Sequence, residues 1–429
     1  MSTVMYYLRK LIPRPLFSLV RPVYHYCITF IAAIWYRFPA QHITVIGVTG
    51  TKGKSTVTEL INALFEAHGT RTAVAGTIRF KLGEATEPNL YKMTMPGRFF
   101  VQRFLRRAVD AGCTVAILEM TSEGVKQYRH KWIDLDALVF TNITPEHIES
   151  HGSFEKYVAA KFELAKALAR SRKRPRRMIA NTDDERGALF LSVDVEKKLP
   201  YNLKSAELYT LKKEGVSLVY KGVTMRVPLA GLMNVSNALA AITTAESFGI
   251  PLRTMESAFA SLPPIHGRVE QFSSPKDAGK HITAVVDYAH TPDSLTKLYE
   301  TFPKEHKVCI LGNTGGGRDT WKRPEMGRIA GEHCDRVILT NEDPYDEDPH
   351  AIVEAMRVGI EDQSKVQIVM DRRVAIRTAL TEAPDGSIVI ISGKGTDPYI
   401  MGPRGSKVVW SDAMVVKEEL AKLHSTDPA

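Results

Sequence analysis

A glycine-rich segment between a predicted strand and a predicted helix constrains this 429-residue chain most strongly. The apolar run at residues 42–50 predicts a buried strand, and apolar positions at helical spacing predict a helix over residues 55–69. Between them, the sequence GVTGTKGKST (residues 47–56) supplies three glycines. Glycines let the backbone approach a phosphate group, and the N–H groups at a helix start can bind its oxygens. Lys54 can neutralise the β- and γ-phosphates and Ser55 can ligate Mg²⁺, so the segment predicts binding of a nucleoside triphosphate.

Strands and helices alternate along most of the chain. A first series of strand patterns covers residues 72–76, 114–120, 137–143 and 178–181, and a second series begins near residue 282. This alternation predicts an α/β protein with mostly parallel sheets. Short strand patterns after residue 200 predict a small antiparallel sheet. We therefore expect an N-terminal segment (1–41), a central nucleotide-binding domain (42–266) and a C-terminal Rossmann-like α/β domain (267–429).

The net charge of +9 is concentrated in two short segments. Residues 1–41 contain five Lys or Arg and residues 166–177 contain seven, with no acid in either, so the rest of the chain has a net charge of about −3. The body of the protein is therefore not basic. No nucleic-acid recognition motif accompanies residues 166–177, and we expect no nucleic-acid partner. We expect that segment to be a solvated helix end and loop facing phosphate, nucleotide or lipid headgroups.

The N-terminal segment contains an uncharged apolar run, Tyr26–Tyr36, between Arg21 and Arg37. A membrane-spanning helix needs about 20 such residues, so this run is too short to span a bilayer by itself. Its aromatic and basic residues are typical of a helix that lies on an anionic membrane surface, here the inner leaflet. A helix packed on the protein body or on a partner is the alternative.

The four cysteines are widely separated and form no CxxC pair. This spacing indicates neither a zinc site nor a disulfide framework, and it fits the reducing cytoplasm. We therefore expect a cytoplasmic protein, bound peripherally at the inner membrane surface if the N-terminal segment attaches there.

The sequence GVTGTKGKST resembles the ATP-binding signature of the Mur ligase superfamily, whose members join a carboxylate to an amine while ATP is split to ADP and phosphate. The resemblance implies a central P-loop-type Mur ligase ATPase domain that uses ATP and Mg²⁺. It also implies an acyl-phosphate route, in which the carboxylate attacks the γ-phosphate and the amine then displaces phosphate. The loop residues that would contact ATP are Gly50, Thr51, Lys52, Gly53, Lys54, Ser55 and Thr56.

Three further segments resemble superfamily motifs around the metal and the acceptor. The segment Leu118–Ser122 implies Mg²⁺ binding by Glu119 and substrate contacts from Thr121 and Ser122. The segment Thr141–His147 resembles TN-x-x-x-DH, with Glu146 in the place of aspartate, and implies that His147 holds a second metal. The segment Tyr157–Lys161 matches the one whose lysine is carbamylated, which would make Lys161 an oxygen ligand for Mg²⁺. The implied catalytic residues are Lys54, Glu119, His147 and Lys161, and the implied metal ligands are Ser55, Glu119, His147 and Lys161.

The C-terminal half resembles one branch of this superfamily. The segment Asp287–Leu295 is similar to the DYAHTPDAL segment of the UDP-N-acetylmuramoyl-tripeptide synthetases, which add the third residue of the peptidoglycan stem peptide. The segments Gly315–Asp319, Ile391–Gly395 and Trp410–Asp412 resemble the same enzymes. The resemblance implies a muropeptide acceptor and a free amino acid as substrates. The implied nucleotide contacts outside the loop are Asn234, Arg268, Asp287 and His290, and the implied substrate contacts in this half are Arg318, Glu342, Asp343, Tyr345, Gly393 and Asp397.

Departures from the family pattern concern the substrates. Only 41 residues precede the first predicted strand, where the family keeps a domain that binds the UDP-sugar. Either the uridine end is held differently, or the acceptor is another carboxylate, such as a polyglutamate, another amino-acid polymer or a lipid-linked muropeptide. The amino-acid-selecting segment DNPR reads Glu342–Tyr345 here, and the final residues of GKGHE read Thr396 and Asp397. Tyr345 lacks the charged fork that suits the distal carboxylate of diaminopimelate, and the acids favour lysine or ornithine.

A non-catalytic ATP-binding scaffold at the membrane is the alternative from another functional class. The retained Lys54, Glu119, His147 and Lys161 argue against it, because a scaffold does not need two metal sites.

Overall fold

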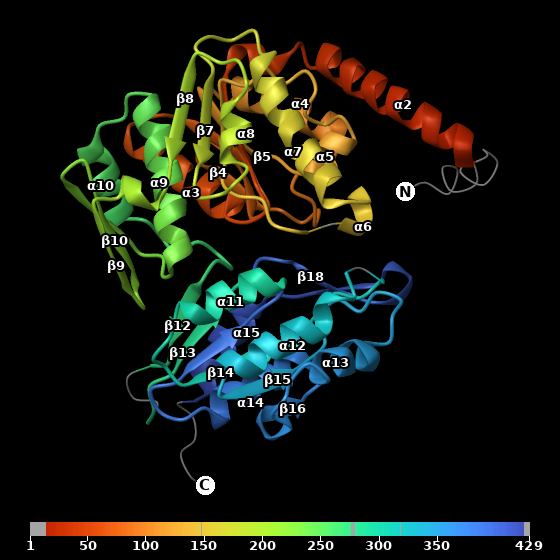
Figure 1. Cartoon of the computed structure of the whole chain (residues 1–429), viewed down its shortest axis with the longest axis vertical. Coiled ribbons are helices and arrows are strands. Elements are labelled where there is room, and N and C mark those ends of the chain that lie inside the picture. The colour runs from red at the N-terminus through yellow and green to blue at the C-terminus, as the bar shows by residue number, and fades with distance from the viewer. Residues whose placement is uncertain (1–13, 147, 276–278, 318, 424–429) are drawn as a thin grey trace. The chain divides into compact units, whose positions relative to one another are not determined.

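The computed structural model describes residues 14–146, 148–275, 279–317 and 319–423, which form two compact units (Figure 1). The first unit consists of Met1–Glu146, His151–Asn202 and Leu239–Thr254, and the second of His147–Ser150, Leu203–Ala238 and Met255–Ala429. Both have sheets flanked by helices, so the predicted α/β class is confirmed. The boundaries given above for the three regions stay predictions.

The first unit is built on an eight-stranded sheet in the order β4-β3-β2-β5-β1-β6-β7-β8. From β2 to β8 in this spatial order, each strand is parallel to the next one. The hairpin of β3 and β4 adds an antiparallel edge beside β2. Its central strands are continuous apolar runs because helices cover both faces of the sheet. The strands are β1 (Thr44–Thr49), β2 (Thr72–Ala75), β3 (Arg79–Leu82), β4 (Ala85–Pro88), β5 (Val115–Glu119), β6 (Ala137–Phe140), β7 (Arg177–Asn181) and β8 (Lys197–Tyr201).

The helices around this sheet pack on opposite faces. Apolar side chains of α4 (Arg98–Asp110), α7 (Phe154–Ala169) and α8 (Gly187–Leu191) share one core with the sheet, and α3 (Lys54–Ala67) packs on β1, β2 and β5 outside that core. The remaining elements are α2 (Arg14–Trp35), η1 (Pro39–His42), α5 (Ser122–Lys126) and α6 (Ile148–His151).

The register of the central strands sets the place of the site. Val48 of β1 is level with Glu119 of β5 and with Val139 of β6. The loops that follow these three parallel strands therefore begin at the same edge of the sheet, which is where ligands bind in open α/β sheets.

The second unit has a six-stranded sheet in the order β12-β13-β17-β14-β15-β16, with only β12 antiparallel. The strands are β12 (Glu270–Ser273), β13 (Thr283–Val286), β14 (Lys307–Leu311), β15 (Arg336–Leu339), β16 (Val366–Ile368) and β17 (Ile388–Ile391). The helices around it are α11 (Pro292–Glu300), α12 (Lys322–His333), α13 (Pro349–Arg357), α14 (Arg372–Glu382) and α15 (Asp412–Lys422), with apolar cores on both faces of the sheet.

The remaining elements are short strands and connecting helices. The predicted small antiparallel sheet is confirmed as β9 (Leu208–Lys212), β10 (Gly215–Tyr220) and β11 (Val223–Val227). The hairpin of β18 (Tyr399–Met401) and β19 (Lys407–Val409) is a further two-stranded sheet. The other helices are α9 (Leu232–Ser247), α10 (Leu252–Ala260), η2 (Leu203–Ser205), η3 (Gln363–Lys365) and η4 (Pro403–Gly405).

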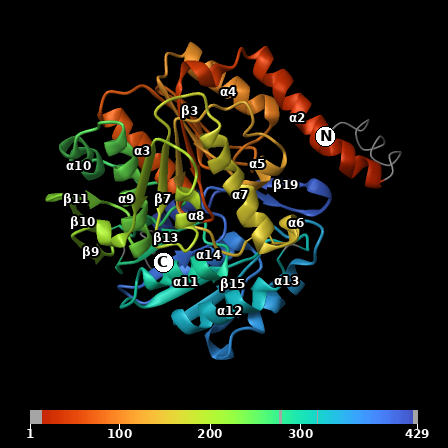
Figure 2. The ribbon, with the colours of Figure 1, turned by 45° about the horizontal axis from the view of Figure 1, so that its top comes forward.

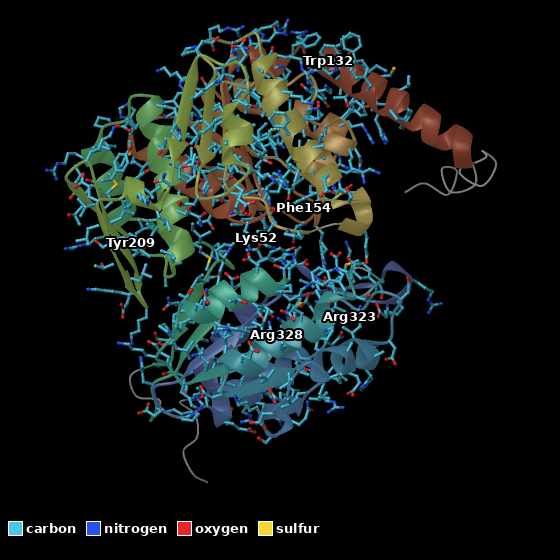
Figure 3. The ribbon with its side chains drawn as sticks, in the orientation of Figure 1. Lys52, Trp132, Phe154, Tyr209, Arg323 and Arg328 are labelled. Atoms are coloured by element: carbon cyan, nitrogen blue, oxygen red, sulfur yellow. A yellow bond between two sulfur atoms is a disulfide. The ribbon has the colours of Figure 1, made fainter. Side chains whose placement is uncertain are left out.

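The N-terminal helix α2 is longer than the predicted run and lies beside α4 (Figure 2). Its buried side chains are His25, Thr29, Ala32 and Ala33. Its exposed apolar side chains are Val23, Tyr24, Tyr26, Phe30, Ile31, Ile34 and Trp35, which keep 37–74% of their surface in solvent. The ring of Trp132 lies 4.7 Å from that of Phe30, next to α2 (Figure 3). In the part of the chain that the structure describes, no helix is long and apolar enough to cross a membrane.

The basic segment 166–177 is paired with carboxylates of its own unit. Lys166 and Arg170 contact Glu163, Arg172 contacts Asp134, Lys173 contacts Asp136, and Arg174 and Arg176 contact Glu196. Six of its seven basic side chains therefore have a carboxylate partner, and the expected contact of the segment with phosphate, nucleotide or lipid headgroups stays a prediction.

The cysteine prediction is wrong for one pair. Cys309 in β14 and Cys334 after α12 form a disulfide, with Cα atoms 6.1 Å apart. The sequence does not reveal this pair, because the two cysteines are 25 residues apart and become neighbours only when β14 and α12 fold together. Cys27 and Cys113 are free.

A buried ion pair joins two helices of the second unit. Arg372 donates from Nε and Nη2 to the two carboxylate oxygens of Asp412, both at 2.8 Å, and both side chains are at most 1% exposed. Trp410 Nε1 donates to the same carboxylate at 2.8 Å. The segment Trp410–Asp412, which resembles a family motif, thus has a structural role here.

We expect Asp412→Ala to lower the free energy of unfolding by about 3–5 kcal/mol, because it leaves a buried guanidinium unpaired. The measurement is urea unfolding of the full chain followed by circular dichroism. Glu332→Ala, which removes one partner of the exposed Arg328, is the matched control and should cost less than about 1 kcal/mol. Equal losses in the two variants would contradict the structural role of the buried pair.

Candidate active site

The predicted phosphate-binding loop connects β1 to α3. Gly50 has φ +149°, and a Cβ atom there would lie 1.9 Å from Thr141 Oγ1, so only glycine fits. Gly53, with φ +82°, precedes Lys54, the first residue of α3. The Lys54 ammonium donates to Thr51 O at 2.9 Å. The loop therefore has the backbone conformation that two glycines make possible, and it ends at the start of a 14-residue helix.

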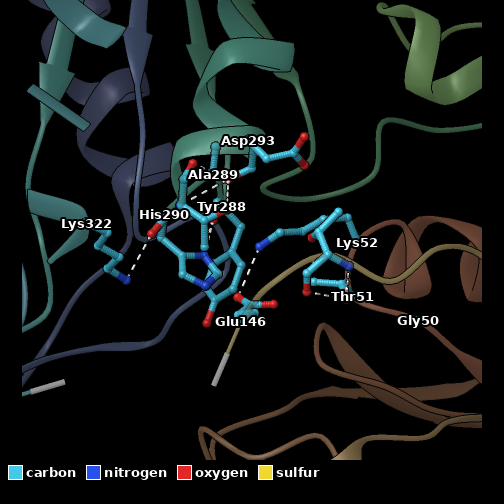
Figure 4. Close-up of polar contacts among 12 residues, drawn as sticks. Gly50, Thr51, Lys52, Glu146, Tyr288, Ala289, His290, Asp293 and Lys322 are labelled. Atoms are coloured by element: carbon cyan, nitrogen blue, oxygen red, sulfur yellow. Dashed lines mark hydrogen bonds and ion pairs between the residues drawn. The ribbon is translucent and has the colours of Figure 1, made fainter. Parts of the chain in front are cut away.

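The segment after β6 holds this loop in place. Asn142 accepts hydrogen bonds from Thr51 N (2.8 Å, to the backbone oxygen) and from Lys52 N (2.9 Å, to Oδ1). Thr141 Oγ1 donates to Lys52 O at 2.6 Å. The Lys52 ammonium and the Glu146 carboxylate form an ion pair at 3.1 Å (Figure 4). The prediction did not single out Thr141 or Asn142, although the Thr-Asn motif was the signal for them.

Glu119 lies at the end of β5 and is 2% exposed. Its carboxylate accepts from Ser55 Oγ, 3.1 Å from both oxygens, and from Thr77 N at 2.8 Å and Thr77 Oγ1 at 3.0 Å. The structure thus brings together two of the predicted metal ligands, Ser55 and Glu119, as hard oxygen donors of the kind Mg²⁺ takes. His147, another predicted ligand, lies outside the described residues. Within the described ranges, no three His, Cys, Asp or Glu side chains cluster as a metal site.

Lys161 is a fully buried lysine beside the phosphate-binding loop. It projects from α7, is 2% exposed, donates to Gly50 O at 2.7 Å and lies 4.8 Å from the centre of the Tyr157 ring. Burial lowers the pKa of Lys161 well below its usual value, and the nearby Lys54 lowers it further, against the opposing effect of Glu146 and Glu119. A lysine with such a depressed pKa is a neutral amine over a wider pH range than an ordinary surface lysine.

The predicted acceptor residues begin the short helix α5. Thr121 caps it, its Oγ1 accepting from Gly124 N at 3.2 Å, and Ser122 Oγ lies 3.1 Å from His151 Nε2. Thr94 was missed by the prediction, and its hydroxyl lies 2.8 Å from that of Thr77, which in turn donates to Glu119.

A buried arginine near these residues was also missed. Arg129 follows α5 and is 7% exposed. It donates from Nη1 to Met95 O and from Nη2 to Gln127 Oε1 (2.7 Å), and its buried Nε has no hydrogen-bond partner among the described residues. Burial, followed by the proximity of Arg98, lowers the pKa of Arg129 to about 10. A buried guanidinium held by neutral oxygens is suited to an anionic ligand.

The predicted nucleotide residues of the second unit are only partly clustered. The Arg268 guanidinium lies 4.8 Å from the centre of the Tyr288 ring, and Asp287 accepts from Val269 N (2.8 Å) and Ala289 N (2.7 Å). His290 Nδ1 lies 2.7 Å from Tyr288 O, and Lys322 Nζ donates to His290 O at 3.1 Å (Figure 4). Arg268, Asp287 and His290 therefore surround one aromatic residue.

Asn234 is held instead by Asn237 of its own helix, α9, and by the segment just before that helix. Its amide donates to Ala230 O at 2.7 Å and accepts from Asn237 at 2.9 Å.

The predicted amino-acid-selecting residues are enclosed by partners that the sequence did not reveal. Asp343 accepts from Lys394 Nζ (2.8 Å) and from Met401 N (2.7 Å), and Asp397 contacts the same ammonium at 3.0 Å. Glu342 is 3% exposed, and burial raises its pKa, although Arg372 and Lys394 oppose the rise. Glu342 and Asp343 are therefore enclosed, and Asp343 is already paired with a cation.

Gly393 and Tyr345 flank this enclosed group. Gly393 has φ +105°, and a Cβ there would lie 2.1 Å from Glu342 Oε2. Tyr345 has φ +52° and lines a cavity of about 600 Å³. Arg318 lies outside the described residues.

We expect Gly50→Ala to weaken ATP binding at least tenfold, because the new Cβ atom would displace the loop from Thr141. Gly69→Ala is the matched control, since Gly69 also has a positive φ (+81°) but nothing lies within 4 Å of its Cβ position. Titration calorimetry with ATP and Mg²⁺ measures both variants. Equal affinity in the Gly50 and Gly69 variants would show that the close approach is not required.

Two parts of the chain match known domains. Residues 48–245 match the Mur ligase middle domain, and residues 267–395 match the Mur ligase glutamate ligase domain. The chain is 35% identical over 423 residues to a UDP-N-acetylmuramyl-tripeptide synthetase of Roseiflexus sp. (strain RS-1), covering 92% of this chain and 81% of the relative. It is 33% identical over 408 residues to a UDP-N-acetylmuramoyl-L-alanyl-D-glutamate–2,6-diaminopimelate ligase of Caldanaerobacter subterraneus subsp. tengcongensis, covering 91% and 81% of the two chains.

A solved structure of a UDP-N-acetylmuramoyl-L-alanyl-D-glutamate–2,6-diaminopimelate ligase has the same fold. It superposes with a TM-score of 0.61 at 30% identity, covering 90% of this chain and 79% of the other. The resemblance stated from the sequence motifs is confirmed, and this chain belongs to the Mur ligase family of ATP-dependent, ADP-forming ligases.

Proposed function

We propose that this chain joins a free amino acid to the carboxylate of a muropeptide through an acyl-phosphate in peptidoglycan precursor synthesis. The observation that carries the proposal is the meeting of Ser55, Glu119 and Lys161 with the phosphate-binding loop in one unit. The names of the relatives, which are muropeptide ligases, support the choice of acceptor. The alternatives are the same chemistry on another carboxylate and, less well supported, a non-catalytic scaffold.

Four residues of the first unit have a role in this proposal. Ser55 and Glu119 would hold Mg²⁺, which when bound neutralises charge on the phosphates. Lys54 and the backbone N–H groups at the start of α3 would bind phosphate oxygens. Arg129 would hold an anionic group of the acceptor, because its guanidinium is buried among neutral oxygens. Catalysis then depends on positioning of the carboxylate and stabilisation of developing charge.

Lys161 is proposed to act as a carbamate. Its neutral amine would attack the carbon of CO₂, so that an N–C bond forms while one C=O π bond opens and its electron pair moves to oxygen. The nitrogen would then release a proton to water, which leaves the carbamate anion. Burial supports this step because it depresses the pKa of the amine, and only the neutral amine is nucleophilic. The product would present two carbamate oxygens to Mg²⁺ in place of the lysine amine.

The amino acid is proposed to carry an amine side chain, as lysine or ornithine does. Tyr345 stands where the family pattern has arginine. The cavity that Tyr345 lines also contains Asp346, Glu347 and Asp348, and no Lys or Arg is among the described residues that line it. Glu347 is paired with Arg323, so Asp346 and Asp348 supply the remaining negative charge.

We expect the purified chain to release phosphate from Mg-ATP with UDP-MurNAc-dipeptide and lysine or ornithine, and much less with diaminopimelate. Lys161→Ala should lose turnover at least about 100-fold, as removal of one charge-stabilising group does, and acetate should restore part of it. Lys156→Ala, an exposed lysine on the same helix, should keep the wild-type rate.

Three results would count against these proposals. No release with any amino acid would exclude the muropeptide proposal and leave the other acceptors. Release with diaminopimelate alone would contradict the proposed side-chain preference. An unimpaired Lys161→Ala variant would exclude the carbamate.

We also propose that the outer face of α2 attaches the protein to the inner surface of the cytoplasmic membrane. This face exposes Ile31, Ile34 and Trp35, which are 49%, 51% and 74% in solvent, and Arg37 follows it. An apolar face with tryptophan and flanking basic residues favours the interface of anionic lipids. The attachment would be peripheral.

We expect the wild-type chain to co-sediment with vesicles of phosphatidylglycerol and phosphatidylcholine, and Ile34→Glu to reduce the bound fraction several-fold, because a charge enters the apolar face. Leu208→Glu is the matched control, since Leu208 is 63% exposed on β9. Equal sedimentation of the two variants, or none of the wild type, would exclude attachment through α2.

A further inference from the structure

The inner face of α2 makes a polar contact with the protein body. His25 is 8% exposed, and its Nε2 lies 3.1 Å from Nη2 of Arg98, the first residue of α4. A guanidinium has only donors, so the histidine nitrogen accepts this hydrogen bond and the proton of the neutral ring lies on Nδ1. The contact therefore orients both the ring of His25 and the guanidinium group of Arg98.

The guanidinium group of Arg98 also contacts the loop after α5. Arg98 Nη2 also donates to Gln127 Oε1 at 3.3 Å, and Arg129 Nη2 donates to that same oxygen at 2.7 Å. Two guanidinium groups thus share one amide oxygen, and the proximity of Arg98 contributes to the lowered pKa of Arg129. Because the guanidinium groups of Arg98 and Arg129 repel each other, each of them needs hydrogen-bond acceptors that hold it in place.

Arg129 connects this group to the candidate active site. Its Nη1 donates to Met95 O, and the neighbouring Thr94 contacts Thr77, which donates to Glu119. The Sδ atom of Met95 would lie 2.5 Å from a Cβ atom at Gly124, so Met95 also packs closely on α5. A continuous set of contacts therefore runs from α2 to the carboxylate proposed to bind Mg²⁺.

We propose that α2 positions Arg129, the residue proposed to bind the muropeptide acceptor. It does so through the chain of hydrogen bonds His25–Arg98–Gln127–Arg129, which we call the bridge, and His25 is a positioning residue. The inference rests on the proposed function, because it takes Arg129 as the group that holds the anionic acceptor. Without the His25 nitrogen, the Arg98 guanidinium loses one of the acceptors that hold it, and the Gln127 oxygen that orients Arg129 is less firmly placed. Loss of the bridge then weakens binding of the acceptor and leaves binding of ATP unaffected.

The experiment compares three variants of α2 in the full chain. His25→Phe keeps an aromatic ring and removes the acceptor nitrogen, whereas His25→Gln offers an amide oxygen to Arg98. Thr29→Val is the matched control, because Thr29 is buried on the same face and its hydroxyl donates only to His25 O among its described contacts. The substrates are UDP-MurNAc-dipeptide, Mg-ATP and the amino acid that the wild type accepts best.

We expect His25→Phe to raise the KM for UDP-MurNAc-dipeptide about tenfold, the scale of one charged hydrogen bond, with the KM for ATP unchanged. His25→Gln should recover most of the wild-type value, and Thr29→Val should match the wild type. An unchanged acceptor KM in His25→Phe, or an equal rise in the KM for ATP, would overturn the proposal.

Amide hydrogen exchange separates this proposal from the proposed function. In His25→Phe, but not in Thr29→Val, exchange should be faster at residues 97–98 and 127–131. If the wild type releases no phosphate with the muropeptide, the proposed function fails, and the bridge is judged by exchange alone. Unchanged exchange at these residues would overturn the bridge even in an active enzyme.

Discussion

The parallel pairing of β1 with both β5 and β6 is the constraint on which the rest of the first unit depends. With Val48 level with Glu119 and Val139, the phosphate-binding loop, the Glu119 carboxylate and the Thr141–Glu146 segment all start at one edge of the sheet. A shift of one residue in either pairing would turn every side chain of the strand to the other face. The hydrogen bonds from the loop to Asn142 and from Ser55 to Glu119 both require this register.

Around that edge the protein buries charged groups that a stable fold alone would not require. Lys161 and Arg129 both have pKa values lowered first by burial, and among the residues that the structure describes neither forms an ion pair like that of Arg372 and Asp412. Isolated buried cations destabilise a fold, whereas a fully hydrogen-bonded buried pair is tolerated. Buried cations with depressed pKa values are typical of functional sites, which is consistent with roles for both residues in binding or chemistry.

The sequence predicted the features that depend on neighbouring residues and missed those that depend on distant partners. The loop at Gly47–Thr56 and the strands on either side of it follow from local glycines and apolar periodicity, and Ser55 and Glu119 could be named from their motifs. No local pattern shows that Lys394 neutralises Asp343, or that Cys309 reaches Cys334. For the same reason the sequence showed two acids at 342 and 343 but not the cation, 51 residues away, that pairs with Asp343.

The helix α2 illustrates how one element can serve two of the proposed roles. Residues at helical spacing divide it into a buried face, which contains His25, and an exposed apolar face, which contains Ile34. If the exposed face binds lipid, attachment engages the same helix whose buried face contacts Arg98. Because coupling between two binding events is reciprocal, an acceptor that draws Arg129 into place would in turn favour the membrane-bound helix. Both effects would act through the contacts of α2, so neither requires a large change in the sheet that positions Glu119.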